Sequence, residues 1–499
     1  MGSRDLRFRF GALDRSGLIL GLRAGQAAIV GVGVGLMVVS LVLGHGFGGV
    51  IAAAVVLTIT AGSTFAPVAG RGVDEWIPVL VRWFGGGARE WTSHLPRIGH
   101  RARSTRAGTA VAATDAVLPP SLRGVTLLAV RVGTGELGVV KDMAQGTYTA
   151  VLRVRGGSYA LMADSEKARA LGGWGGILAA FAHHGSVVSR LQVVIRTVAE
   201  DPDGMARYFQ EQRLVHLDSP ILRSYISLVD EAAPVTQAQE AYVALAIGMR
   251  QSSRAIKQAG GGDDGAVTVL VRQLQLLQSQ LERADVRVEG ALTSRLLAQV
   301  LREAWEPSAT FDLRRRGSGA ASDGVDLSGA GPQATRARWT HYETDGGACH
   351  ATYWISEWPR VSVSADFLVP LLLQSQAKMT FGITMAPVDP SRAQREIETA
   401  QTSRLADESL REKHGFRTSA RTTREQQAIE NREQELADGH AEYRFSGYIT
   451  ITAPDVKELT TACGEVEQQA RNSHLDVRRL DGDHDRAFTY TLPLCRGVR

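Results

Sequence analysis

The 499-residue sequence predicts an α+β protein with two parts. An N-terminal two-helix transmembrane hairpin precedes a cytoplasmic split-βαβ (ferredoxin-like) region, which forms two lobes and carries a long helical insertion. Three observations predict this arrangement. Positions 24–70 contain no Asp, Glu, Lys or Arg. Further along, β-rich and helical segments alternate in the order β-α-β and then again β-α-β. Finally, 44% of the residues are hydrophobic but mean hydropathy is only -0.08, which excludes a protein built mostly of membrane spans.

The charge-free stretch is long enough for two helical spans. One span needs about 20 apolar residues to cross a hydrocarbon core of roughly 30 Å. We place the spans at Ala27–Leu43 and Val50–Ala66, joined by the glycine-rich turn Gly44–Gly49. A secretory signal peptide has one shorter apolar region and a cleavage site, and a buried hairpin of this length without a charge is rare. The stretch therefore predicts a membrane hairpin, assigned to residues 24–70.

Arginines flank the hairpin on both sides, with five before it and seven in the segment that follows, whereas the turn has none. The positive-inside rule then places residues 1–23 and the chain after the hairpin in the cytoplasm, as in a two-pass plasma-membrane protein. In the first span, Gly31 and Gly35 form a small-xxx-small surface that allows close helix packing. That surface packs against the second span or against another membrane subunit.

Residues 71–118 are assigned to a basic interfacial helix and a linker. Here Trp76, Trp83 and Trp91 alternate with Arg82 and Arg89. Tryptophan is enriched at the level of the lipid headgroups, and arginine interacts there with anionic lipid. We therefore expect an interfacial helix at about 74–92. The alternative, nucleic-acid binding through arginine and aromatic rings, is possible but less favoured because the segment directly follows a span.

The cytoplasmic region divides into a first α+β lobe (119–309), a flexible linker (310–338) and a second α+β lobe (339–499) with a charged helical arm at 391–438. The division follows a Gly/Ser/Ala/Asp-rich run after Arg314. The expected strands and helices are, in order, Leu127–Val132, Val139–Lys141, Tyr148–Arg155, Ser165–His183, Ser189–Val198, a helical pair at about 204–231, Tyr242–Ile247, Val267–Leu281, Val286–Glu289, Ser294–Trp305, Ala351–Ile355, Arg360–Val363, Phe367–Leu373, Met379–Met385, Tyr443–Thr452, a helix capped by Asp455, and Leu475–Leu480.

The sequence offers no catalytic constellation and predicts no cofactor and no metal ligand. A phosphate-binding P-loop contains a Gly-Lys pair, which occurs nowhere in this chain. The three cysteines are far apart and lack the spacing of a zinc site. Asp481–Asp485 lacks the glycine and the distal glutamate of a calcium-binding loop. These observations predict a chain that is not an enzyme.

Several short motifs carry a family resemblance. The segment Arg15–Gln26, with Gly17 and Gln26, leads into the hairpin and resembles the start of small two-helix membrane subunits of type IV secretion systems; it also resembles EccE-like components of type VII secretion. The Trp358-Pro359-Arg360 turn, the charged arm and the closing Leu492-Pro493 step resemble the amino-terminal, non-motor domain of conjugation ATPases. The whole order is similar to a family of actinobacterial integral membrane proteins encoded with conjugation-type genes.

The resemblance implies a structural subunit of the inner membrane that docks a separate motor ATPase and other membrane subunits, and that forms a homo-oligomer in the lipid bilayer. It carries over no catalytic residue. Two alternatives remain. One is the EccE-like subunit of a type VII complex. The other is a membrane-tethered DNA-binding module that uses the arginines at 97–106 and 314–316.

Overall fold

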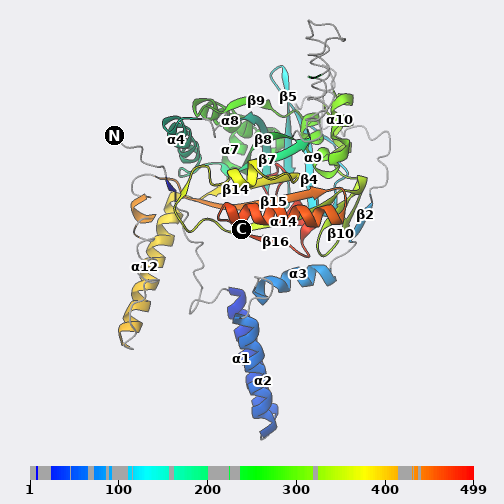
Figure 1. The fold of residues 1–499 in the computed structure, drawn as a ribbon. Coiled ribbons are helices and arrows are strands. Elements are labelled where there is room, and N and C mark those ends of the chain that lie inside the picture. The colour runs from blue at the N-terminus through cyan, green and yellow to red at the C-terminus, as the bar shows by residue number, and fades with distance from the viewer. Residues whose placement is uncertain are drawn as a thin grey trace.

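A computed structural model describes the residues 7–8, 24–44, 47–65, 72–85, 89–92, 111–114, 116–156, 162–199, 224, 237–317, 324–413, 430, 432–435 and 440–498. Two apolar helices, a connecting helix and a large α+β body follow one another along the chain (Figure 1). The helical pair predicted at about 204–231 lies outside the described residues except for Ser224, as do Gly17 and the arginines at 97–106.

The first two helices, α1 (Ala24–Leu43) and α2 (Phe47–Phe65), lie side by side and project away from the body (Figure 1). Within the described residues, one helix is long and apolar enough to cross a membrane, the segment Gly25–Leu43 of α1. The apolar part of α2, Phe47–Gly62, is shorter than that. The structure therefore gives one candidate span near the N-terminus, where the sequence predicts two.

The helix α3 (Val73–Gly85) lies across the space between the apolar pair and the body (Figure 1). It is shorter than the interfacial helix predicted at 74–92, because the chain returns to the body as the strand β2 (Glu90–Thr92). Before α1, the short strand β1 (Arg7–Phe8) pairs antiparallel with β13 (Val363–Ser364) of the body.

The body is built on one 14-stranded antiparallel sheet with strands from both predicted lobes. Its neighbours run β2-β10-β11-β12-β15-β14-β7-β8-β6-β5-β4-β3, with β16 paired to β12 and β9 paired to β6. The strands are β3 Val111–Thr114, β4 Val125–Val132, β5 Gly135–Asp142, β6 Thr147–Arg155, β7 Val188–Ala199, β8 Gln237–Gly248, β9 Arg287–Ala291, β10 Ala334–Ala337, β11 Tyr342–Thr344, β12 Cys349–Glu357, β14 Met379–Pro387, β15 Tyr443–Ala453 and β16 Asp476–Arg479.

The helices of the body connect these strands. They are α4 Asp164–Phe181, α7 Ser253–Gln258, α8 Gly262–Arg283, α9 Ser294–Trp305, α10 Thr310–Gly317, α11 Val369–Leu373, α12 Pro390–Lys413, α14 Val456–Asn472 and α15 His484–Phe488. The helix α9 has the bounds that the sequence predicts, and the Thr293 hydroxyl caps it by accepting from Leu296 N. Asp455 caps α14 as predicted, since its carboxylate accepts from Glu458 N.

The two halves of the sheet have the same strand connectivity. In the first half, α4 joins β6 to β7, and β8 lies between these two parallel strands; β9 then lies beside β6. In the second half, β12 and β14 are parallel with β15 between them, and β16 lies beside β12. The halves meet where β7 pairs antiparallel with β14.

The two faces of the sheet are covered differently. Register pairs such as Leu191 with Met385 and Ile195 with Phe381 alternate with pairs that point to the other face. On the first face, apolar side chains pack under α4 and α8 in one half and under α11 and α14 in the other. On the second face, α9 and the segment that follows α15 cover the centre and pack around Trp305 and Phe488.

The segment 310–338, expected to be a flexible linker, has structure of its own in its described parts. It contains α10, the strand β10 and a 3₁₀ turn in which Leu327 is buried. Residues of this segment pack against α9, whose buried apolar face needs a cover. The charged arm begins as predicted, with the long helix α12, and the part of the arm around Gly415 lies outside the described residues.

Candidate functional site: the junction between the apolar helices and the body

The helix α3 connects the apolar pair to the body. Its sequence suits a short helix, because Asp74 and Glu75 lie in the first turn and Arg82 lies in the last, as the helix dipole favours. Pro78 interrupts the backbone ladder, and the Nε of Arg82 donates to the carbonyl of Pro78 at 2.9 Å. Residues within α3 therefore determine where this helix begins and ends, and its two sides can contact different parts of the molecule or its surroundings.

Two of the three tryptophans predicted at the membrane interface pack against the body. Trp76 stacks on Trp339 with ring centroids 5.8 Å apart and an interplanar angle of 9°. Trp83 meets the same ring edge-on at 5.2 Å. One aromatic ring of the body is therefore held between two rings of α3, spaced two turns apart.

Ion pairs flank this aromatic cluster. The guanidinium of Arg478 donates to the carboxylate of Glu75 at 2.8 Å, and it also lies 5.5 Å from the ring centroid of Trp354. Arg82 pairs with Asp483 at 3.6 Å. The side chains of both ion pairs are partly exposed, so each pair alone contributes little to the stability of the junction. Together they fix the rotation of α3 about its axis, since they lie on the side that carries Trp76.

A glycine permits the close approach of α3 to the body. Gly482 has φ +76°, and a Cβ built there would lie 2.9 Å from both Trp339 and Val79. Its backbone N–H donates to the carbonyl of Trp339 at 2.8 Å. This position therefore requires glycine both for its backbone conformation and for the contact between the body and α3.

Beyond α3, the chain joins the edge of the sheet. Trp91 lies in β2, opposite Thr335 of β10, and Glu90 pairs with Arg336 at 2.7 Å. Arg89 donates to the carbonyl of Trp83 at 2.9 Å, and its guanidinium lies 4.3 Å from the Trp83 ring centroid. The five residues predicted at the membrane interface thus all lie at the junction. Each of them contacts α3 or the body, and Trp91 does so as part of the sheet.

The apolar helices pack through glycine, though not through the glycines that the sequence singled out. A side chain at Gly31 or Gly35 would meet no atom within 4 Å. A Cβ at Gly33 would instead lie 2.3 Å from the Thr60 hydroxyl of α2, so Gly33 allows the close helix contact. At the base of the pair, Gly25 faces Asp74 of α3, and a Cβ there would lie 2.7 Å from the Asp74 Cβ.

The described motif residues that carry the family resemblance are divided between α1 and the body. Gln26 is in the first turn of α1. Trp358 packs edge-on against Phe445 at 5.3 Å, Pro359 is buried, and Arg360 is exposed and pairs with Glu357. The structure does not bring these residues together with the Leu492-Pro493 step.

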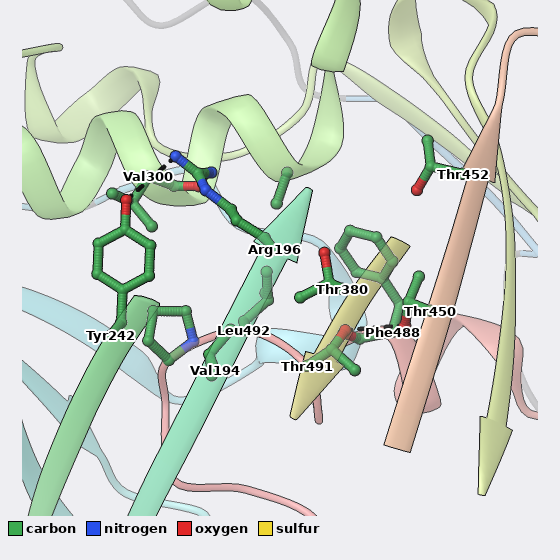
Figure 2. Close-up of a pocket in the computed structure, with 12 residues that line it drawn as sticks. Val194, Arg196, Tyr242, Val300, Thr380, Thr450, Thr452, Phe488, Thr491 and Leu492 are labelled. Atoms are coloured by element: carbon green, nitrogen blue, oxygen red, sulfur yellow. Dashed lines mark hydrogen bonds between the residues drawn. The ribbon is translucent and has the colours of Figure 1, made fainter. Parts of the chain in front are cut away.

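Leu492 and Pro493 line a small cavity of about 20 Å³ at the centre of the sheet, large enough for one water molecule (Figure 2). Arg196 lies at its edge and joins a buried network of charges. The guanidinium donates to Glu240 at 2.7 Å and to Glu303 at 2.5 Å, while Arg314 pairs with both carboxylates at 2.9–3.0 Å. Burial acts to raise the pKa of Glu240, but Arg196, Arg314 and Arg153 together lower it to about 2.

One of the alternative functions, DNA binding, depends on a residue of this network. Arg314, named as a possible DNA contact, is held by Glu240 and Glu303. Within the described residues, no group of three His, Cys, Asp or Glu side chains is placed to hold a metal ion. No protein-family model and no curated protein matches this sequence.

Sequence reasoning missed the body side of the junction. Trp339, Arg478 and Gly482 receive α3, yet all three lie far from it in the chain. The Asp-Gly-Asp sequence around Gly482 gave one signal, because a glycine between two acids is typical of a tight turn at the surface. The partner of that turn could not be read from its own sequence.

Proposed function

We propose that this chain is a two-pass structural subunit of the inner membrane in a conjugation- or type IV-like secretion machine, and that it anchors a separate motor ATPase. In this proposal both termini are cytoplasmic, α1 and α2 cross the plasma membrane, and the subunit is not an enzyme. The family resemblance supplies the kind of machine. The structure contributes one observation that bears on the anchor.

That observation is the pairing of β1 with β13. Arg7 and Phe8 precede α1, whereas Val363 and Ser364 follow α2, and the two strands share a register. Residues that pair in this way lie on the same side of a membrane. If α1 spans the bilayer, the chain must therefore cross it again before the body, and α2 is the apolar helix in that interval. The pairing of β1 with β13 therefore supports α2 as a second span, although the apolar part of α2 is shorter than that of α1.

The connectivity of the sheet bears on the other part of the proposal, the body that docks the motor ATPase. Each half has two β-α-β crossovers with an antiparallel strand placed between the parallel ones, and this order supports the proposal of a split-βαβ, ferredoxin-like unit. We interpret the body as two such units joined through β7 and β14. A rigid body of this size offers a broad surface for an ATPase and for other copies of the chain.

Thiol labelling in intact cells tests the topology. The native Cys349, Cys463 and Cys495 are buried, so an introduced cysteine reports its own position. Phe47→Cys lies at the start of α2, 81% exposed, and Met143→Cys lies on the body, 60% exposed. A membrane-impermeant maleimide should label the first and spare the second until the cells are opened. Labelling of Met143→Cys in intact cells would overturn the proposed orientation.

Co-purification tests the partner. The full-length chain, extracted in mild detergent, should retain the motor ATPase of the proposed machine, and the purified chain alone should not hydrolyse ATP. The matched control is a chain with Arg196→Met, which disturbs the body but leaves the apolar helices intact. A chain that never associates with that ATPase, or that hydrolyses ATP alone, would contradict the proposal.

A further inference from the structure

We infer that the outer face of α3 inserts into the headgroup region of the bilayer, so that this helix lies in the plane of the membrane surface. The face consists of Ile77, Leu80, Val81 and Phe84, whose side chains are 46%, 38%, 65% and 78% exposed. Their spacing of three and four residues places them on one side of the helix. The opposite side carries Trp76, Val79 and Trp83, which pack against the body.

The position of α3 identifies lipid as the occupant of this face. The apolar segment of α1 begins at Gly25, and Gly25 touches Asp74 in the first turn of α3. The level at which α1 enters the hydrocarbon core is therefore the level at which α3 starts. A helix that runs across the base of a span, as Figure 1 shows for α3, lies at the boundary between the acyl chains and the headgroups.

The charges of α3 agree with this assignment. Three side chains of α3 are charged. Glu75 and Arg82 pair with Arg478 and Asp483 and are directed at the body, and Asp74 lies against Gly25 at the base of α1. None of the four residues of the outer face is charged. Burying their apolar surface in lipid removes it from water and is therefore favourable.

This inference rests on the proposed membrane anchor and adds a consequence to it. Because the tryptophans bind α3 to the body while its outer face binds the lipid, the membrane surface sets the orientation of the body. A flexible tether would leave that orientation free. The residues predicted to meet lipid, Trp76 and Trp83, instead connect the lipid-binding helix to the body.

Depth-dependent fluorescence quenching tests the inference on the full-length chain. An environment-sensitive fluorophore is attached to Val81→Cys or Phe84→Cys, and the protein is reconstituted into vesicles of phosphatidylcholine and phosphatidylglycerol. Two controls are Val34→Cys, which is 46% exposed in the middle of the apolar segment of α1, and Leu276→Cys, which is 37% exposed on α8 at the far side of the body from α3 (Figure 1). The quenchers are iodide in water and a lipid with a nitroxide near its headgroup.

If the outer face of α3 lies in the headgroup region, the emission of fluorophores at positions 81 and 84 should shift to the blue. The nitroxide lipid should quench it, and iodide should not. Iodide quenching at 81 and 84 as strong as at 276, with position 34 still in lipid, overturns the inference and leaves the two-pass proposal standing. Protection from both quenchers shows a protein cover, such as a second copy or another subunit, and also overturns it. Iodide access at position 34 contradicts the membrane anchor itself.

Discussion

The junction at α3 and the centre of the sheet each hold together segments that are distant in the chain, but with different interactions. At the junction, Trp339 is held between two rings, and the flanking ion pairs are partly exposed. At the centre, Arg196, Glu240 and Glu303 are all less than 10% exposed and depend on one another for their charges. The junction therefore consists of separable contacts. At the centre, removing one charged side chain leaves the others buried with fewer partners.

The largest effect is expected at the centre. Replacing Arg196 by methionine leaves Glu240 and Glu303 buried with only Arg314 and Arg153 to compensate them. Breaking a buried pair on one side costs about 3–5 kcal/mol, so the free energy of unfolding should fall by that amount. Urea denaturation of the detergent-solubilised chain measures it. The matched control, Arg360→Met, removes an exposed pair with Glu357 and should cost under about 0.5 kcal/mol.

Acid should also destabilise the centre, through the buried His350. Burial lowers the pKa of His350 from 6.5 to about 3, and the ring lies between the hydroxyls of Thr344 and Thr452. The unfolded chain binds a proton near pH 6.5 that the folded chain refuses, so stability falls as the pH drops below 6.5. At pH 5 the loss from this group is about 2 kcal/mol.

The measurement is the thermal midpoint of the wild-type chain and of His350→Gln between pH 7.5 and pH 5. The variant should show a shallower fall, because it lacks the group that gains a proton on unfolding. The control is His184→Gln at an exposed position, which should change the thermal midpoint with pH as the wild-type chain does. Parallel curves for wild type and His350→Gln would remove His350 as the cause.

At the junction, Trp339→Ala should release α3 without unfolding the body. Each aromatic contact contributes about 0.5–1.5 kcal/mol to stability beyond the effect of its buried area, and the substitution removes two such contacts. Hydrogen exchange on the full chain should show faster exchange of the amides of α3, while those of β8 keep their protection. If protection falls equally in α3 and β8, the junction is not separable and the comparison fails.

The sequence predicted those elements whose signals are local. The predicted helix Ser294–Trp305 has the bounds of α9, and the predicted cap Asp455 begins α14; the Thr293 cap of α9 comes from the structure. The pairing of β7 with β14 could not be predicted, because both strands are apolar and local sequence does not specify a partner. The same limit applies to α3, where Trp83 and Phe84 are adjacent aromatic residues but face opposite surroundings. Nearness to a span suggested lipid for every ring, and only the position of Trp339 separates the two faces.

The smallest effect is expected for Arg82→Ala. Its pair with Asp483 spans 3.6 Å, and the Arg82 side chain is 44% exposed, so water already screens the interaction. Exposed pairs contribute about 0.2–1 kcal/mol, and the loss should shrink further in high salt. Hydrogen exchange of α3 should therefore rise less than in Trp339→Ala, and the difference between wild type and Arg82→Ala should vanish at high salt. An effect as large as that of Trp339→Ala would mean that charge, rather than aromatic packing, holds α3 to the body, and that the junction resembles the centre after all.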